Sequence, residues 1–319
     1  MTVDRSVAER GGPAVAAISA RALARRFGAV RAVEGVDLEI AAGTTFGLLG
    51  PDGAGKSTLI RMLATVLVPS AGDAEIFGKS VTTAPHQVRS RIGYMSQRFS
   101  MYPDLTVAEN LEFFATLRGV SRAERRRRAG GLLAGMGLAD FVERRAQTLS
   151  GGMKQKLMLA VTLMHEPDLL LLDEPTTGVD PVSRREFWRI LSGLRRAGKT
   201  VLVATPYMDE AERCDRLAFL DHGRIAHTGS PAEIKSAIPG VVYEVATGSP
   251  RAALAAVSGL ASVRSAHLYG DTVRVLLATE ADAVALSDRL RDAGVPGATV
   301  RPARVDMEAA FAFLASDRP

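Results

Sequence analysis

A glycine-rich run that ends in a lysine and two hydroxyl side chains has the residue types needed to bind phosphate groups. Glycines let the backbone curl so that its N–H groups point inward, and a helix that follows adds the positive end of its dipole. The lysine of such a loop reaches the β- and γ-phosphates of a nucleotide, and the hydroxyl after it is a ligand for Mg²⁺. The run consists of Gly50, Pro51, Asp52, Gly53, Ala54, Gly55, Lys56, Ser57 and Thr58. It predicts a site for the triphosphate of ATP, with Lys56 on the phosphates and Ser57 on Mg²⁺.

Two adjacent carboxylates, Asp173 and Glu174, follow the apolar run Leu169 to Leu172. At the end of a buried strand, Asp173 is expected to face the metal ion, through a water molecule. Glu174 is then expected to accept a proton from the attacking water as a general base. Because nothing in the sequence marks a phosphate acceptor, these residues predict hydrolysis of ATP rather than transfer of its phosphate.

Ser150, Gly151 and Gly152 open a predicted helix, Met153 to Met164, and form a second ready-made site for an anion. No phosphate loop lies near them in the sequence. A second site of this kind makes sense if it serves a nucleotide held by another subunit. We therefore predict a pair of ATP-binding domains, and the sequence leaves open whether the pair is a homodimer or a heterodimer.

In this order and spacing the three motifs resemble those of the ATP-binding subunits of ABC transporters, over about residues 18–236. The signature of that family is matched by Leu149 to Met153, with Met153 where the family has glutamine. The resemblance implies that two such domains pair head to tail, each ATP lying between one phosphate loop and the signature of the partner. It also implies integral-membrane permease subunits as partners.

Further residues acquire roles from the resemblance alone. Phe27 matches the aromatic residue that stacks on adenine. Gln97 matches the glutamine that senses Mg²⁺ and couples to the membrane subunit, so it is expected both in catalysis and at the metal. Asp180 lies in the match to the loop that crosses the dimer interface. The segment Arg98 to Leu111 belongs to the helical subdomain that receives the coupling helix of a transporter.

Two further positions depart from the family pattern. Pro206 stands where the family has a histidine that contacts the γ-phosphate, and proline has no donor to offer. Loss of one donor aimed at developing charge lowers a rate by about 10²–10³-fold, so slow hydrolysis is expected. Asp52 stands where asparagine is common and adds a carboxylate near the phosphates. With the Gly-Met-Lys-Gln form of the signature, these departures resemble the ABC-2 type efflux ATPases of bacteria.

The elements that must position these motifs are predicted from hydrophobic periodicity. Strand, glycine loop and helix succeed one another at Thr45 to Val66. The apolar runs Leu169 to Leu172 and Val201 to Ala204 are predicted to be buried parallel strands. The fold class is α/β, a P-loop NTPase core of ABC type with a β-rich N-terminal portion, a helical subdomain and a small C-terminal α+β domain. The expected domains are a disordered lead (1–17), an ATP-binding domain (18–238, with its helical subdomain at about 98–165) and an accessory domain (240–319).

Composition limits the class of protein. Of 319 residues, 47% are apolar and 24% charged, as in a folded globular chain. The net charge of +5 is too small to argue for nucleic acid, and none is expected as a partner. The single cysteine, Cys214, excludes an internal disulfide and a multi-cysteine metal site, which fits a reducing cytoplasm. No run approaches the roughly 18 apolar residues of a membrane span, so another subunit must supply any membrane part. The resemblance, with its permease partners, implies a cytoplasmic, peripheral position on the inner face of the cell membrane.

Two other functions stay open. One is a soluble ABC-type ATPase acting on ribosomes or DNA, against which the single ATP domain and the lack of zinc-binding cysteines argue. The other is a regulatory ATP-binding partner with little hydrolysis, which Pro206 favours. The transported substrate cannot be read from this chain, because substrate contacts in such systems lie in the membrane subunits.

Overall fold

The computed structural model describes residues 16–295 and 297–316, with side chains as far as Phe311. By its internal contacts the chain divides into a large unit, which runs to Tyr207 and includes Arg213–His227, and a small unit of Met208–Glu212 with the residues from Thr228 onward. Residues 1–15 of the expected disordered lead lie outside the described residues. The prediction of disorder is wrong for Ala16 and Ala17. These residues begin a strand, because Ala16 pairs with Ala41 of the neighbouring strand.

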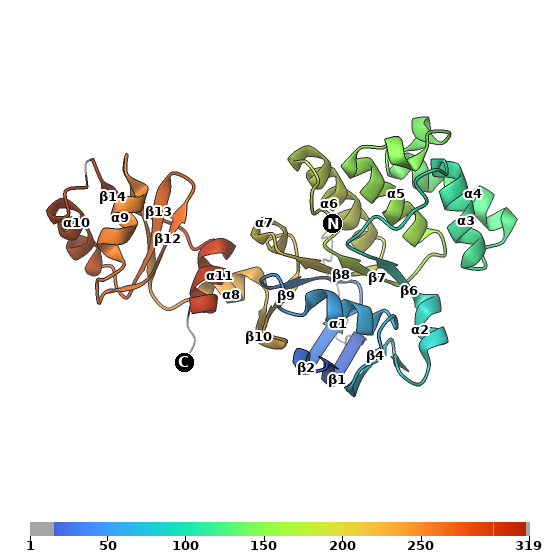
Figure 1. Cartoon of the computed structure of the whole chain (residues 1–319), viewed down its shortest axis with the longest axis horizontal. Coiled ribbons are helices and arrows are strands. Elements are labelled where there is room, and N and C mark those ends of the chain that lie inside the picture. The colour runs from blue at the N-terminus through green and yellow to red at the C-terminus, as the bar shows by residue number, and fades with distance from the viewer. Residues whose placement is uncertain (1–15, 296, 317–319) are drawn as a thin grey trace, which may run out of the picture. The chain divides into compact units, whose positions relative to one another are not determined.

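A six-stranded sheet of order β10-β9-β3-β8-β7-β6 forms the centre of the large unit (Figure 1). Its strands β6, β7, β8, β3 and β9 pair in parallel, and β3, β7 and β8 are buried along their whole length, as the apolar runs predict. The bounds of the six strands are β3 (Thr45–Leu49), β6 (Ile92–Met95), β7 (Leu169–Asp173), β8 (Thr200–Thr205), β9 (Arg216–Asp221) and β10 (Arg224–Gly229).

Helices cover both faces of this sheet, and alternate residues of β7 show which helices lie on which face. Leu169 and Leu171 pack in one cluster with helix α1 (Lys56–Leu63). Leu170 and Leu172 pack in another with α5 (Gly151–Leu163) and α6 (Pro181–Arg196). Figure 1 shows α1 below the sheet and α5 and α6 above it. The phosphate loop and the signature therefore lead into helices on opposite faces of one sheet.

A four-stranded antiparallel sheet of order β2-β1-β4-β5 supplies the β-rich N-terminal portion. Apolar residues of β1 and β2, such as Ile18 and Ile40, pack with α1 in the first cluster. The bounds are β1 (Ala16–Phe27), β2 (Val30–Ala41), β4 (Ala71–Ile76) and β5 (Lys79–Ser80), followed by α2 (Pro85–Arg91).

The helical subdomain holds α3 (Val107–Leu117) and α4 (Arg122–Gly135). Two short 3₁₀ turns, η1 (Ala139–Phe141) and η2 (Ala146–Thr148), lead from α4 to α5. A capping box is present at the start of α3, since the side chains of Thr106 and Glu109 each accept from the other's backbone N–H.

The small unit is a β-α-β-β-α-β arrangement with an antiparallel sheet of order β12-β13-β11-β14, which confirms the predicted α+β class. Helices α9 and α10 pack on one face through a cluster that includes Val245, Val275 and Leu290. The predicted boundary at 238–240 falls later than the contact boundary at Thr228, because α8 packs with this unit. The bounds are α7 (Met208–Ala211), α8 (Pro231–Ser236), β11 (Val241–Ala246), α9 (Pro250–Val257), β12 (Val263–Tyr269), β13 (Thr272–Leu277), α10 (Asp282–Asp292), β14 (Thr299–Pro302) and α11 (Met307–Ser316).

Across residues 16–295 and 297–316, no helix combines the length and the apolar character that crossing a bilayer requires.

Candidate functional site

The glycine-rich loop joins the end of β3 to the first residue of α1, so the strand, loop and helix succeed one another as predicted. Glycine is needed at position 55 for two reasons. Its φ is +107°, a conformation that L side chains rarely adopt, and a Cβ there would lie 2.2 Å from the carbonyl oxygen of Ala32. With glycine at position 55, no side chain there blocks the approach of an anion to the N–H groups at the start of α1 and the positive end of its dipole.

Lys56, the first residue of α1, lies within this loop. Its side chain is only 4% exposed, and its Nζ donates to the carbonyl oxygens of Gly50 at 2.7 Å and Pro51 at 3.0 Å. Burial lowers the pKa of Lys56, and the nearby carboxylates of Glu174, Asp52 and Asp173 act in the opposite direction. The ammonium group is thus held at a fixed point beside the loop backbone.

Ser57 and Asp173 meet beside the lysine. The Ser57 hydroxyl donates to Asp173 Oδ1 at 2.8 Å, while Asp173 Oδ2 is buried and has no hydrogen-bond partner among the described residues. Burial raises the pKa of Asp173, and the bond from Ser57 opposes this shift. The Ser57 hydroxyl and the Asp173 carboxylate, whose Oδ2 can still accept, fit Mg²⁺. This ion binds few protein oxygens and completes its shell with phosphate and water.

Glu174 is hydrogen-bonded on one oxygen. Its Oε2 accepts from Gln97 Nε2 at 2.8 Å and from the Thr177 hydroxyl at 3.2 Å. The backbone of Glu174 has φ +50°, in the left-handed region that non-glycine residues avoid. Outliers of this kind occur where surrounding structure holds a side chain in a demanding position, here at the end of β7.

A pocket of about 310 Å³ brings together eight of the predicted residues, and it does not include Gly50, Pro51, Ala54 or Asp173 in its lining. It is lined by Ala32, Asp52, Gly53, Gly55, Lys56, Ser57, Thr58, Gln97 and Glu174. Asp52 is exposed and belongs to the lining, so its carboxylate stays near any bound phosphate.

Two residues of the site were missed from the sequence. Ala32 lies on β2, and its alternating pattern gave no sign of a role. Thr177 carries a hydroxyl three residues after Glu174, which was the one available signal. Phe27 does not line the pocket; its ring is 47% exposed and lies 4.7 Å from the guanidinium carbon of Arg25.

The start of α5 and the start of α6 lie outside that pocket. Ser150 caps α5 by accepting from the Met153 N–H at 3.3 Å, so this helix begins two residues earlier than predicted. Asp180 caps α6 in the same way by accepting from the N–H groups of Val182 and Ser183.

The two glycines of the signature differ in what they touch. A Cβ at Gly152 would lie 2.5 Å from the Ser183 side chain, so packing within the chain requires glycine there. A Cβ at Gly151 would meet only the Gly178 carbonyl oxygen, at an ordinary 3.5 Å, and its φ is not positive. Nothing within the described chain requires glycine at position 151, which leaves its bare backbone for contacts outside the chain.

Pro206 follows β8 directly. The N–H of Tyr207 donates to the Thr205 hydroxyl at 3.1 Å, and the Arg184 guanidinium lies 3.9 Å from the centre of the Tyr207 ring. The turn after β8 is therefore fixed on both sides of the proline.

Comparison with known proteins identifies this arrangement. The family profile described as ABC transporter matches residues 33–177. The daunorubicin/doxorubicin resistance ATP-binding protein DrrA of Streptomyces peucetius is 42% identical over 277 residues, which cover 86% of this chain and 81% of DrrA. The chain belongs to the ABC transporter family. It carries the ATPase domain of that family, and the resemblance to efflux ATPases of ABC-2 type is confirmed.

Other members of the ABC family agree in sequence and in fold. The Nod factor export ATP-binding protein I of Ralstonia nicotianae is 40% identical over 218 residues, 68% of each chain. A solved ATP-binding subunit of an ABC transporter superimposes with a TM-score of 0.63 at 30% identity, covering 69% of this chain and 92% of that one. The dimeric structure of a bacterial ABC transporter cassette gives a TM-score of 0.62 at 27% identity, covering 67% and 98%. The predicted P-loop NTPase fold of ABC type is therefore confirmed.

Proposed function

We propose that this chain is the ATP-hydrolysing subunit of an export system, and that it powers a membrane permease through nucleotide-driven pairing of two ATP-binding domains. The observation that carries the proposal is the pocket that brings Lys56, Ser57, Gln97 and Glu174 to one point. These side chains come from three separate parts of the sequence. Together they supply a fixed cation, a metal-binding hydroxyl and a carboxylate that can accept a proton.

Within that pocket the residues divide the work of hydrolysis. Lys56 lies beside the loop N–H groups, where it neutralises charge on the β- and γ-phosphates. Glu174 orients the attacking water and accepts its proton, and the bond that Gln97 donates to Oε2 fixes the orientation of the carboxylate. Ser57, Asp173 and Gln97 would hold Mg²⁺, which supplies neutralisation of charge on the phosphate oxygens.

The signature at the start of α5 is proposed to serve the nucleotide of a second domain. Gly151 supports this, because no contact within the described chain requires glycine at that position. The N–H groups at the start of α5 and the positive end of its dipole then face the triphosphate of the partner. Asp180, at the start of α6, is proposed to lie at the same interface, and Phe27 to contact adenine.

With Mg²⁺ and a non-hydrolysable ATP analogue, the chain is expected to pass from monomer to dimer, measured by size-exclusion chromatography with light scattering. Gly151→Asp is expected to weaken this dimer by roughly 100-fold, because a carboxylate would face the triphosphate of the partner. Analogue binding by the monomer should persist, since position 151 lies outside the pocket.

Gly130→Asp is the matched control, because Gly130 lies on α4 with open space around its Cα and ordinary helical φ. Failure of the analogue to join protomers, alone or with the natural counterpart of the chain, would contradict the proposal.

The permease is proposed to meet the helical subdomain. The segment Arg98 to Leu111 leads from Gln97 into α3, so a contact there is linked along the chain to the pocket. Relatives whose names state daunorubicin/doxorubicin resistance and Nod factor export support an export role. As the partner of a permease, the chain would lie on the inner face of the membrane.

Pro206 favours slow hydrolysis at this site, and with it a second candidate function as the less active partner of a heterodimer. Pro206→His is expected to raise the rate of ATP hydrolysis by roughly 100-fold, because it restores a donor to the developing phosphate charge. Phosphate release by the purified chain, measured at saturating ATP, checks this. Pro103→His, at an exposed loop proline, is the control. Fast turnover of the unchanged chain that Pro206→His does not raise would refute slow hydrolysis.

A further inference from the structure

The turn that follows β7 folds Thr177 back onto Glu174. The N–H of Thr177 donates to the Glu174 carbonyl oxygen at 3.3 Å, and its hydroxyl donates to Glu174 Oε2 at 3.2 Å. Thr177 is exposed and does not line the nucleotide pocket. Within the described chain its hydroxyl bonds to Glu174 alone, the residue proposed as the general base.

All hydrogen bonds that the described residues make to the Glu174 carboxylate end on one oxygen. Oε2 accepts from Thr177 and, at 2.8 Å, from Gln97 Nε2. A carboxylate oxygen has two lone pairs, so these two donors occupy the acceptor sites of Oε2. Oε1 keeps its own lone pairs and is the oxygen that can take a proton from water. The two bonds also fix the rotation of the carboxylate, because both donors must stay within reach of the same atom.

The backbone of Glu174 is held separately from its side chain. Its N–H donates to the carbonyl oxygen of Ala204, on β8, at 3.0 Å. At φ +50° the chain also leaves the extended conformation of β7. These features place the Cα of Glu174 but do not restrict rotation about its outer side-chain bonds. The orientation of the carboxylate therefore depends on the donors to Oε2.

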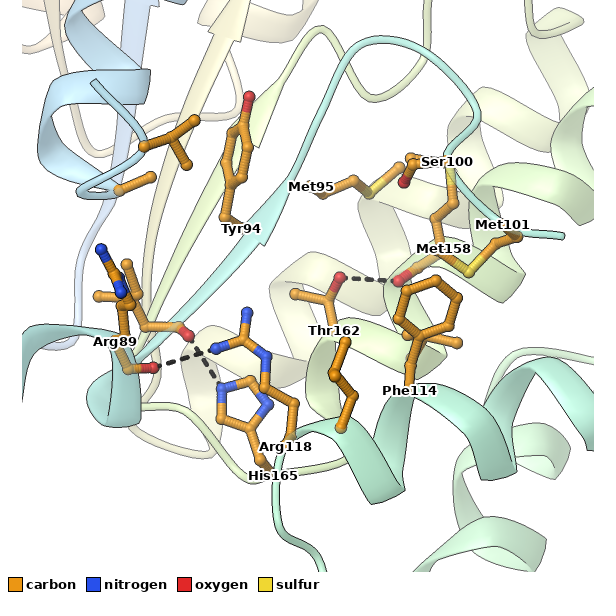
Figure 2. A pocket seen from close by; sticks show the side chains of 15 residues that line it. Arg89, Tyr94, Met95, Ser100, Met101, Phe114, Arg118, Met158, Thr162 and His165 are labelled. Atoms are coloured by element: carbon orange, nitrogen blue, oxygen red, sulfur yellow. Dashed lines mark hydrogen bonds between the residues drawn. The ribbon is translucent and has the colours of Figure 1, made fainter. Parts of the chain in front are cut away.

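The loop that carries Gln97 also borders a second pocket, of about 520 Å³. Met95, which precedes Gln97, and Ser100, which follows it, both line that pocket (Figure 2). The pocket reaches as far as Arg89 on α2 and Arg118 after α3, where Arg118 donates to the Arg89 carbonyl oxygen. The position of Gln97 therefore depends on contacts that do not involve the nucleotide pocket.

Thr177 and Gln97 thus hold Glu174 in different ways. Gln97 is 77 positions away from Glu174 in the sequence, and as a proposed ligand of Mg²⁺ it has a second role. A shift of its loop would break its bond to Glu174. Thr177 belongs to the same turn as Glu174 and moves with it, so its bond does not depend on that loop.

We propose that Thr177 is a positioning residue for hydrolysis: its hydroxyl holds Oε2 of Glu174, so that Oε1 faces the attacking water even when Gln97 turns to the metal ion. The inference rests on the proposed function, because it takes Glu174 as the general base. In the step itself the water oxygen bonds to the γ-phosphorus, the bond from that phosphorus to ADP breaks, and a water proton passes to Oε1. The hydroxyl proton of Thr177 stays on its own oxygen. Thr177 therefore affects the rate only through the orientation of Glu174.

Thr177→Val tests the proposal in the full chain, because valine keeps the branched shape and lacks the hydroxyl. It is expected to lower kcat by about three- to ten-fold and to leave KM for ATP nearly unchanged, since one exposed hydrogen bond is lost. Thr177→Ser keeps the hydroxyl and should stay within about two-fold of the unchanged kcat. Thr82→Val is the matched control, because the exposed Thr82 hydroxyl donates to the Asp73 carboxylate at 2.8 Å, away from the nucleotide pocket. Phosphate release over a range of ATP concentrations measures kcat and KM.

A double variant shows whether Thr177 acts through Glu174. In a chain that carries Glu174→Gln, Thr177→Val is expected to change the remaining rate by less than about two-fold, because the base that Thr177 positions is already absent. Single-turnover measurements with radiolabelled ATP reach the low rates of these chains. Dimer formation with the non-hydrolysable analogue should be the same for Thr177→Val and the unchanged chain, which shows that the variant folds and pairs.

An equal loss of rate from Thr177→Val with and without Glu174→Gln would overturn the inference. So would a kcat that Thr177→Val leaves within about two-fold of the unchanged chain. A weaker dimer, or a failure of Thr177→Ser to retain turnover, would also overturn it, because Thr177 would then have a structural role. If Glu174→Gln itself keeps its turnover, the proposed function is wrong. If Glu174→Gln is inactive and Thr177→Val is not impaired, only the present inference is wrong.

Discussion

Glu174→Gln is expected to lower the rate of ATP hydrolysis by about 10²–10⁴-fold while leaving ATP binding nearly unchanged. The amide has the shape of the carboxylate and can still accept the hydrogen bond that Gln97 donates at 2.8 Å, but it cannot take a proton from water. ATP should then remain bound, so the dimer that forms with a non-hydrolysable analogue should form with ATP itself. Phosphate release and light scattering on the same sample measure both effects.

Glu75→Gln is the matched control for this change, because Glu75 lies exposed on β4 and away from the pocket. Retention of more than about a tenth of the original turnover by Glu174→Gln would remove Glu174 from the role of general base. The ratio of the Glu174→Gln rate to the unchanged rate is informative even if Pro206 makes both rates low, because the variant and the unchanged chain both carry Pro206.

Lys56→Ala is expected to weaken ATP binding by roughly 10–100-fold, since hydrogen bonds from a charged donor contribute about 1.5–3 kcal/mol each. Lys56 is nearly buried and its Nζ is held by two loop carbonyls, so little ordering of the side chain is needed to meet a phosphate. Titration calorimetry with Mg²⁺ and the non-hydrolysable analogue measures the loss.

A thermal melt of Lys56→Ala separates binding from folding, because the variant also removes the partner of the Gly50 and Pro51 carbonyls. Lys79→Ala, on the exposed strand β5, is the control for loss of one positive charge. If Lys56→Ala melts like the unchanged chain and still binds the analogue with undiminished affinity, the phosphate role of Lys56 is wrong.

Motifs that are local in sequence were the ones that could be predicted. The apolar runs before Gly50 and Asp173 form buried parallel strands, because a strand covered on both faces needs apolar residues at every position. In the small unit, β11 begins directly after Gly240, and its apolar residues are local signals of a strand. These features depend on a few neighbouring residues, and the sequence contains all of them.

Features that depend on distant residues could not be predicted. The bond between Gln97 and Glu174 joins residues 77 positions apart, and only the pairing of β6 with β7 brings them together. The sequence resemblance named both residues without placing them in contact. Short elements such as α2 and β10 carry too few residues for a period to show. The meeting of Arg89 with Arg118 likewise follows from how α2 and α3 are placed.

At Glu174 the left-handed backbone favours one kind of residue and catalysis requires another. An L residue with a Cβ is strained at φ +50° by about 1–2 kcal/mol, a strain that glycine does not feel and asparagine tolerates better. Neither replacement has a carboxylate to accept a proton. In a protein that no longer needs to hydrolyse ATP, replacement of Glu174 by glycine or asparagine would therefore relieve this backbone strain and favour the folded state.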